Sequence, residues 1–265
     1  MMTLASLVFW TWFSTTQLLV AAAAVLGRIV SGPFDPKRAV PHMISCLGGG
    51  HYYQLWPFWK VTVQHRERLP KARPCVVVVN HQSLGDILLL FHLRWSFKFV
   101  SKKTVFYVPG IGQLMWASGY VPLDRSNRAS AGKMLRHCQH WLDMRVPVLF
   151  FPEGTRSLDG LIQSFKMGAF NLAFDKQVTV LPILLDGCMQ TLPKHGFVIQ
   201  RSSHMFLRIL PEVDSTQFAN AAELRDHVHA LMVREHEQLR RERKPMLRGR
   251  FREAQPCQTE PEVAA

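Results

Sequence analysis

The 265-residue sequence is short of cysteine and of acidic side chains, and both shortages narrow what it can be. Its five cysteines are scattered and form no CxxC pair, which is typical of a reducing compartment and of a protein without structural zinc. Only 19 acidic residues oppose 32 basic ones, giving a net charge of +13. We therefore expect an anionic partner, which could be nucleic acid, phospholipid headgroups or a phosphorylated substrate.

Several catalytic signatures are missing from the sequence as well. There is no GxSxG elbow, no Walker loop and no GxGxxG, so serine hydrolases of that type, NTPases and dinucleotide-binding enzymes lack their residues. No internal repeat occurs. With 48% hydrophobic and 19% charged residues, the chain is neither disordered nor a polytopic membrane protein. Its length suits one domain with appendages.

Residues 1–27 contain no charged side chain. A helix of that length would cross a hydrocarbon core of about 30 Å. A cleaved signal peptide is the alternative, with small residues at 21–24 for cleavage, but no Lys or Arg precedes the apolar run. We favour a membrane anchor. Arg28, Lys37 and Arg38 follow it, so the positive-inside rule places the rest of the chain in the cytoplasm, on a cell inner membrane or its equivalent.

Residues 41–59 form a second candidate for membrane contact. Gly48, Gly49 and Gly50 are expected to break the chain, and residues 51–59 are dense in Tyr, Trp and Phe. Such rings prefer the headgroup zone of a bilayer. A loop that packs its aromatic side chains on the domain explains the composition equally well.

From residue 60 onward, short apolar runs alternate with helix-like stretches, which predicts an α/β domain around a mostly parallel sheet. The expected strands are 61–64, 75–79, 97–100, 146–151, 178–185 and 205–210, and the expected helices are 87–95, 129–144 and 167–175. We divide the chain into an anchor and interfacial segment (1–59), a catalytic domain (60–221), a C-terminal helix (222–244) and a disordered tail (245–265).

The stretch CVVVVNHQSLGD, residues 75–86, contains the first candidate catalytic pair. Its uniformly apolar run predicts a buried central strand, which ends at Asn80 and His81, where α/β sheets place their ligands. Asp86 can meet His81 only if the histidine lies in the loop and Asp86 starts the next helix. Asp86 would then fix one imidazole nitrogen as N–H and leave the other to accept a proton from a hydroxyl.

A second buried strand empties into the polar loop of FPEGTRS, residues 151–157. Gly154 allows close backbone approach, Thr155 offers a hydroxyl and an amide, and Arg156 offers a planar fork for a phosphate or an acyl oxyanion. Glu153 would position Arg156 or accept a hydrogen bond from a substrate hydroxyl.

Further basic residues are candidates for anion contact. Residues 119–125 read as a short strand that ends in Asp124 and Arg125, and Arg125 could bind phosphate or pair with Asp124. Lys102 and Lys103 follow an expected strand, and Lys166 lies near the second polar loop. Each is a weak signal alone, because surface lysines are usually only solvated.

Together these stretches resemble the glycerophospholipid acyltransferase family, and the lysophosphatidic acid acyltransferases in particular. NHxxxxD matches Asn80, His81 and Asp86, and FPEGTRS matches residues 151–157 without a departure. The second motif matches residues 119–125, with Pro122 in place of the usual apolar residue, and the fourth matches residues 180–183. The family's lysine and FKxG segment correspond to Lys102 or Lys103 and to residues 165–168.

The resemblance implies acyl transfer from acyl-CoA or acyl-carrier protein to the free sn-2 hydroxyl of 1-acyl-glycerol-3-phosphate, which yields phosphatidic acid. It implies no metal and no cofactor other than the acyl donor as co-substrate. The implied catalytic residues are His81 as base and Asp86 as its orienting partner. The implied ligands of the acceptor's phosphate are Lys102, Arg125, Glu153, Gly154 and Arg156, with Thr155 beside them.

Three alternatives remain open: a nucleic-acid-binding protein, a non-catalytic lipid-binding protein of the same fold, and the same chemistry on another acceptor such as a lyso-ornithine lipid. The charge distribution disfavours the first, because residues 60–136 contain thirteen basic against three acidic residues, around the first two motifs and beside a membrane-seeking N-terminus. A basic run at 240–252 could grip anionic lipid or form a solvated tail.

Overall fold

The computed structural model describes residues 2–71, 73–191, 198–199 and 203–248. Its centre is a seven-stranded sheet in the order β1-β7-β6-β2-β5-β3-β4. The strands are β1 (Trp59–Gln64), β2 (Cys75–Val79), β3 (Lys98–Lys102), β4 (Val121–Leu123), β5 (Val148–Phe150), β6 (Thr179–Asp186) and β7 (Ser203–Ile209). The helices are α1 (Met2–Ser31), α2 (Ala39–Leu55), α3 (Asp86–Phe91), α4 (Ile111–Ser118), α5 (Arg128–Asp143), α6 (Gly168–Asp175) and α7 (Ala221–Arg248).

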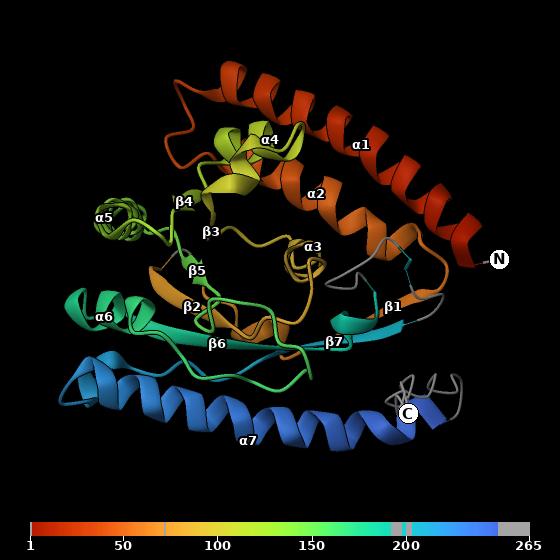
Figure 1. Cartoon of the computed structure of the whole chain (residues 1–265). Coiled ribbons are helices and arrows are strands. Elements are labelled where there is room, and N and C mark those ends of the chain that lie inside the picture. The colour runs from red at the N-terminus through yellow and green to blue at the C-terminus, as the bar shows by residue number, and fades with distance from the viewer. Residues whose placement is uncertain (1, 72, 192–197, 200–202, 249–265) are drawn as a thin grey trace, which may run out of the picture.

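The predicted α/β fold with a mostly parallel sheet is confirmed. Strands β4, β3, β5, β2 and β6 run parallel, whereas β7 pairs antiparallel with β6 and β1 pairs parallel with β7. Helices α1 to α4 lie on one side of the sheet, and α6 and α7 lie on the other (Figure 1). Strand β2 is buried along its whole length because both faces of the sheet are covered, which explains why all five of its residues are apolar.

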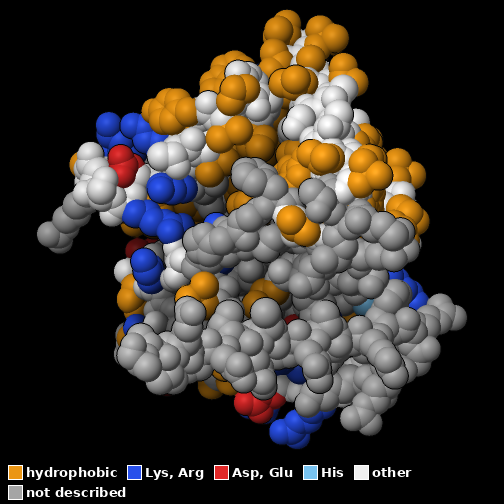
Figure 2. All heavy atoms as spheres, turned by 45° about the vertical axis from the view of Figure 1, so that its right-hand side comes forward, with side chains coloured by type: hydrophobic (Ala, Val, Ile, Leu, Met, Phe, Trp, Pro, Cys, Tyr) orange, Lys and Arg blue, Asp and Glu red, His pale blue; other side chains and the backbone are white. Residues whose placement is uncertain are grey.

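Helix α1 extends across the top of the molecule and packs on α2 and α4 (Figure 1). By length and composition, Leu4–Ser31 could cross a membrane. Its inner face is buried through Ser6, Phe9, Gln17, Ala21 and Ala24. The opposite face exposes a stripe of large apolar side chains at Leu4, Leu7, Val8, Leu18, Leu19, Leu26, Ile29 and Val30. Figure 2 shows hydrophobic side chains gathered at this end of the molecule.

The predicted chain break at Gly48, Gly49 and Gly50 is wrong, because α2 continues through all three glycines. They let neighbouring elements approach the helix closely. A Cβ atom on Gly48 would lie 2.4 Å from Val20 of α1, and one on Gly49 would lie 2.4 Å from the ring of Phe91 on α3. The residues that look like a break therefore allow α1 and α3 to pack tightly on α2.

The aromatic side chains after these glycines mostly pack inside the protein. Tyr52, Tyr53, Trp56 and Trp59 are all buried, and Phe9 of α1 contacts three of them. Of the two explanations left open by the sequence, packing on the domain accounts for these rings. Buried residues between Phe9 and Trp59 share one continuous apolar core with β2, β6 and β7.

A buried lysine ties the start of α2 and the end of α4 to the sheet. The Lys98 side chain of β3 donates hydrogen bonds to the carbonyl oxygens of Arg38 (3.2 Å) and Ser118 (2.7 Å), and its ammonium lies 5.0 Å from the Trp141 ring centre. Burial, reinforced by the nearby Arg38 charge, lowers the pKa of Lys98 to about 7. Helices α2 and α4 are thus fixed to the strand that ends at Lys102.

Helix α7 covers the other side of the sheet and continues to Arg248, beyond the predicted end at residue 244. The helix therefore includes Pro245, the residue at which the sequence predicted the tail to begin. The predicted tail lies outside the described residues from residue 249 onward.

Candidate active site

The His81 and Asp86 side chains meet where β2 ends. Nδ1 of His81 lies 2.7 Å from Oδ2 of Asp86, which also accepts hydrogen bonds from the backbone amides of Gln82 (2.6 Å) and Ser83 (2.9 Å). Helix α3 begins at Asp86, so the histidine lies in the loop and the aspartate on the first helical turn, as the spacing predicts. Asp86 is fully buried, whereas 21% of the His81 side chain is exposed.

The loop that follows β5 clamps the backbone of His81 from both sides. Oε1 of Glu153 accepts a hydrogen bond from the His81 amide (2.9 Å), and the Ser157 amide donates to the His81 carbonyl (2.8 Å). The Phe151 ring stacks on the imidazole at 4.2 Å between ring centres. These contacts explain why the two motif loops belong together: one contains the imidazole and the other holds it in position.

Glu153 faces the protein backbone and is not part of the cavity wall. Its second oxygen accepts a hydrogen bond from the Gln163 amide (3.3 Å). Burial raises the pKa of Glu153 to about 7, although the amides of His81 and Gln163 oppose the shift. The contacts of Glu153 are those of a residue that positions His81.

Asn80 fixes the end of β2 to β6. Its side-chain oxygen accepts a hydrogen bond from the Leu185 amide (2.8 Å), and its side-chain nitrogen donates to the Leu185 carbonyl (2.9 Å). These two hydrogen bonds extend the backbone pairing of β2 with β6 by one more residue, with a side chain in place of the backbone. It holds the residue directly before His81.

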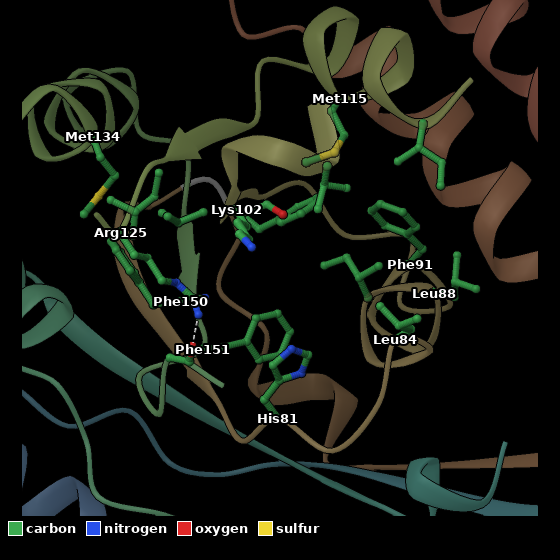
Figure 3. A pocket seen from close by; sticks show the side chains of 18 of the residues that line it. His81, Leu84, Leu88, Phe91, Lys102, Met115, Arg125, Met134, Phe150 and Phe151 are labelled. Atoms are coloured by element: carbon green, nitrogen blue, oxygen red, sulfur yellow. Dashed lines mark hydrogen bonds between the residues drawn. The ribbon is translucent and has the colours of Figure 1, made fainter. Parts of the chain in front are cut away.

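A cavity of about 540 Å³ opens beside the imidazole. Figure 3 shows the side chains of His81, Lys102 and Arg125 around this cavity. Most of the remaining wall is apolar and comes from the loop before α3 and from α3, β3, α4 and β5, including Leu84, Leu88, Phe91, Met115 and Phe150. Trp10, Phe13 and Gln17 of α1 also line it, so the N-terminal helix contributes directly to the cavity.

The structure brings some of the predicted substrate-binding residues together and separates others. Lys102, Arg125 and Gly154 line the cavity with His81, and Lys166 joins them. Of the two adjacent lysines, only Lys102 does so. Asp86, Glu153, Thr155 and Arg156 are not part of the wall.

Gly154 lies where the cations of the cavity wall gather, and we call Lys102, Arg125, Lys166 and the backbone at Gly154 the basic corner of the cavity. Its φ is +73°, a conformation that suits glycine, and an added Cβ would lie 2.8 Å from Nζ of Lys166. Its carbonyl accepts a hydrogen bond from the Arg125 guanidinium. The side chains of Arg125 and Lys166, from two other segments of the chain, therefore lie against the backbone at Gly154.

No group of three or more His, Cys, Asp or Glu side chains that could hold a metal ion occurs among the described residues. His137, His140 and Asp143 follow one another at intervals of three residues on α5, a spacing that could place metal ligands on one face. Asp143 instead forms an ion pair with Lys176 (2.7 Å).

Two parts of the site are not predicted by the motifs. The apolar wall is one, since Leu84, Leu88 and Met115 look like ordinary core residues in the sequence, and α4 itself was not expected. The clamp around His81 is the other. For Lys166, the FKxG pattern of residues 165–168 is the signal in the sequence that points to a role in the site.

Residues 60–186 match the acyltransferase family model. Residues 60–186 therefore form an acyltransferase-family domain. A similar protein is a 1-acyl-sn-glycerol-3-phosphate acyltransferase of Chlamydomonas reinhardtii, 39% identical over 196 residues, which cover 71% of this chain and 57% of that protein. A chloroplastic 1-acyl-sn-glycerol-3-phosphate acyltransferase of Arabidopsis thaliana is 41% identical over 182 residues, 68% of this chain and 50% of that protein.

The chain thus spans about half the length of these two acyltransferases. Among solved structures, the 1-acyl-sn-glycerophosphate (LPA) acyltransferase PlsC from Thermotoga maritima has a similar fold, with a TM-score of 0.73 at 28% sequence identity. The similarity covers 91% of this chain and 98% of that one.

Proposed function

We propose that this protein transfers an acyl group from a thioester donor to the sn-2 hydroxyl of 1-acyl-glycerol-3-phosphate and so produces phosphatidic acid. One observation carries the proposal. His81, held by Asp86, lines an apolar cavity whose wall also contains Lys102, Arg125 and Lys166. A base, an apolar space and a cluster of cations are what a lipid that bears both a hydroxyl and a phosphate requires.

In the proposed reaction, His81 acts as the general base. The bond to Asp86 keeps Nδ1 protonated, so Nε2 is free to accept the proton of the acceptor's hydroxyl. The hydroxyl oxygen attacks the thioester carbonyl, the C–S bond breaks, and the leaving thiolate takes the proton from His81. No acyl-enzyme intermediate is needed, and neither a metal nor another cofactor enters these steps.

The acceptor's phosphate would bind at the basic corner formed by Lys102, Arg125, Lys166 and the backbone at Gly154. Arg125 presents a planar fork there, which suits a phosphate oxygen pair. The acyl chain would lie along the apolar wall toward Met115 and Phe91. Thr155 and Arg156 are not assigned to the substrate's phosphate, since they do not line the cavity.

We further propose that α1 lies along a membrane rather than across it. Its inner face is buried at Ser6 near one end and at Ala24 near the other, so little of the helix could leave the domain to span a bilayer. The polar Thr16 and Gln17, unfavourable in a membrane span, face the protein: Thr16 bonds Tyr52 at 2.6 Å, and Gln17 lines the cavity. The exposed apolar stripe would then enter one leaflet.

This placement brings the cavity, which α1 helps to line, next to the lipid that supplies the acceptor. Helix α7 lies on the opposite side of the sheet (Figure 1), so the described part of the basic run at 240–252 faces away from that surface. The catalytic domain would remain in the cytoplasm. Leu19→Glu together with Leu26→Glu should release the protein from anionic vesicles, whereas Val108→Glu, at another exposed apolar position, should not.

The central test is a panel of lysolipid acceptors, labelled acyl-CoA and purified protein, with products identified by mass spectrometry. We expect phosphatidic acid from 1-acyl-glycerol-3-phosphate, and a loss of about 10²- to 10⁴-fold in kcat for His81→Ala. His140→Ala, which removes an exposed histidine outside the cavity, is the matched control.

The same panel separates the competing functions. Preference for a lyso-ornithine lipid or another lysophospholipid would keep the chemistry and change the acceptor. Lipid binding without any product would indicate a non-catalytic protein. Full activity of His81→Ala would refute the mechanism. Replacing acyl-CoA by acyl-carrier protein identifies the donor.

A further inference from the structure

A second, smaller pocket of about 240 Å³ lies beside the candidate active site. Three basic or nitrogen-bearing side chains from two separate elements converge on it: Lys103, from the turn after β3, and Lys133 and His137 of α5. Asn127 and Ser130 add polar groups to its wall. Nothing in the proposed acceptor site uses any of these residues.

The wall between the two pockets consists of one strand end. Leu123 and Arg125 line the large cavity, and Pro122 and Asp124 line the small pocket. Successive side chains along an extended segment point to opposite sides, so the alternation follows from the backbone. Lys102 and Lys103 divide in the same way, and Met134 borders both pockets. A ligand that leaves the large cavity at this edge meets the small pocket next.

The positive charge of the small pocket comes from side chains and does not depend on the start of α5. There the Asn127 side chain already accepts hydrogen bonds from the amides of Ala129 (2.9 Å) and Ser130 (3.4 Å). Asp124, the one acidic residue of the wall among those that the structure describes, accepts hydrogen bonds from the backbone amide and hydroxyl of Ser126. The pKa of Asp124 is lowered mainly by the bonds from Ser126 and less by the charge of Lys103. No salt bridge joins Asp124 to Lys103 or Lys133 among the described residues, so both ammonium groups remain available to an anion.

We propose that this second pocket binds a phosphate group of the acyl donor. The inference rests on the proposed function, because acyl transfer to a lysophosphatidic acid joins two substrates that both contain phosphate. Lys102, Arg125 and Lys166 serve the acceptor at the large cavity, and Lys103, Lys133 and His137 serve the donor at the small pocket. The donor's thioester reaches His81 while its phosphate-bearing arm exits past Met134. Phosphopantetheine provides this chemistry in both acyl-CoA and acyl-carrier protein.

The test measures donor and acceptor KM separately for a Lys103→Ala/Lys133→Ala double variant. Four donors with the same acyl chain are compared: acyl-CoA, acyl-carrier protein, acyl-phosphopantetheine and acyl-pantetheine, which has no phosphate. We expect the KM for phosphate-bearing donors to rise about tenfold or more, with kcat and the acceptor KM unchanged. The KM for acyl-pantetheine should be the same in wild type and variant.

A Lys71→Ala/Arg241→Ala variant is the matched control, since it removes two exposed cations outside both pockets. Loss with acyl-CoA alone would identify phosphates found only in CoA as the ligand, and loss with acyl-carrier protein as well would identify the shared phosphate. An unchanged donor KM, a raised acceptor KM, or equal loss with acyl-pantetheine would overturn the assignment.

Binding of CoA alone, measured by titration calorimetry, keeps this inference separate from the proposed function. If wild type acylates no lysolipid but binds CoA about tenfold more tightly than the double variant, the proposed function fails and the donor site stands. If both bind CoA equally, the donor site fails whatever the acceptor panel shows.

Discussion

Two regions at the same edge of the sheet contain buried carboxylates, and they are stabilised by different partners. On the cavity side, Asp86 is held by an imidazole and two amides, and Glu153 is held by two amides. On the α7 side, Asp186 at the end of β6 pairs with Arg243 at 2.7 Å and lies 3.6 Å from His236. The two regions differ in whether a cation satisfies the carboxylate.

This difference suggests that the first region serves the reaction and the second serves the stability of the fold. Backbone amides stabilise a carboxylate without neutralising it, so Asp86 can still act on His81. The pKa of the Asp186 carboxyl falls to about 2: burial alone would raise it, but the bonds and charges of His236 and Arg243 lower it by more. A neighbouring pairing of Arg208 with Glu242 fastens α7 further along. We therefore expect changes in the first region to affect rate and changes in the second to affect stability.

The largest expected effect is that of Asp86→Asn. An amide can hold the imidazole in place but favours the wrong tautomer, so kcat should fall by about 10³- to 10⁴-fold. Steady-state kinetics with 1-acyl-glycerol-3-phosphate measure the loss, and thermal unfolding checks that the variant folds. Asp175→Asn, at an exposed carboxylate, is the control and should keep full activity. A loss below tenfold would show that Asp86 does not orient the base.

Arg243→Met should act on stability instead. It leaves the buried Asp186 carboxylate without its closest cation, which should lower the free energy of unfolding by about 3–5 kcal/mol. Urea titration measures this change. Arg241→Met removes an exposed arginine two positions earlier on the same helix and should change stability by less than about 0.5 kcal/mol. A folded Arg243→Met variant with wild-type stability but reduced kcat would erase the distinction between the two regions.

Glu153→Gln sharpens the comparison through pH. The raised pKa of Glu153 means that its protonated form favours folding, and this contribution is lost as the pH rises through about 7. Relative to Glu153→Gln, wild type should lose about 2 kcal/mol of unfolding free energy between about pH 5.5 and about pH 8. Glu237→Gln on the exposed face of α7 should follow wild type. Parallel curves for wild type and Glu153→Gln would mean that Glu153 stays ionised throughout.

The smallest expected effect concerns Cys188, which lies between the two regions. Burial, with the Asp86 charge next in importance, raises the pKa of its thiol well above the ordinary value. Oδ1 of Asp86 lacks a hydrogen-bond partner by geometry within the described part of the chain, so this protonated thiol is the group available to it. Cys188→Ala should lower kcat about fivefold, from a loss of ~1 kcal/mol, and Cys188→Ser should restore it. Equal rates for both variants would contradict this role.

The sequence predicted the strands of the sheet and the pairing of His81 with Asp86, because both depend on short-range patterns. A five-residue apolar run requires burial on both faces, and the spacing from His81 to Asp86 allows only one geometry. It did not predict α4 or the continuity of α2 through Gly48. A glycine run in isolation favours a break, and only the contact with Val20 explains why the helix persists.

The location of the positive charge, the motif loops and the apolar N-terminus were determined by the sequence alone, since each is a local property of composition. Which lysine faces which pocket, and that Glu153 holds the backbone of His81, were decided only by the tertiary structure. These contacts join residues far apart in the chain, such as His81 with Glu153 and Arg125 with Gly154. Their geometry depends on how parallel strands bring their carboxyl ends to one edge, which no single segment specifies.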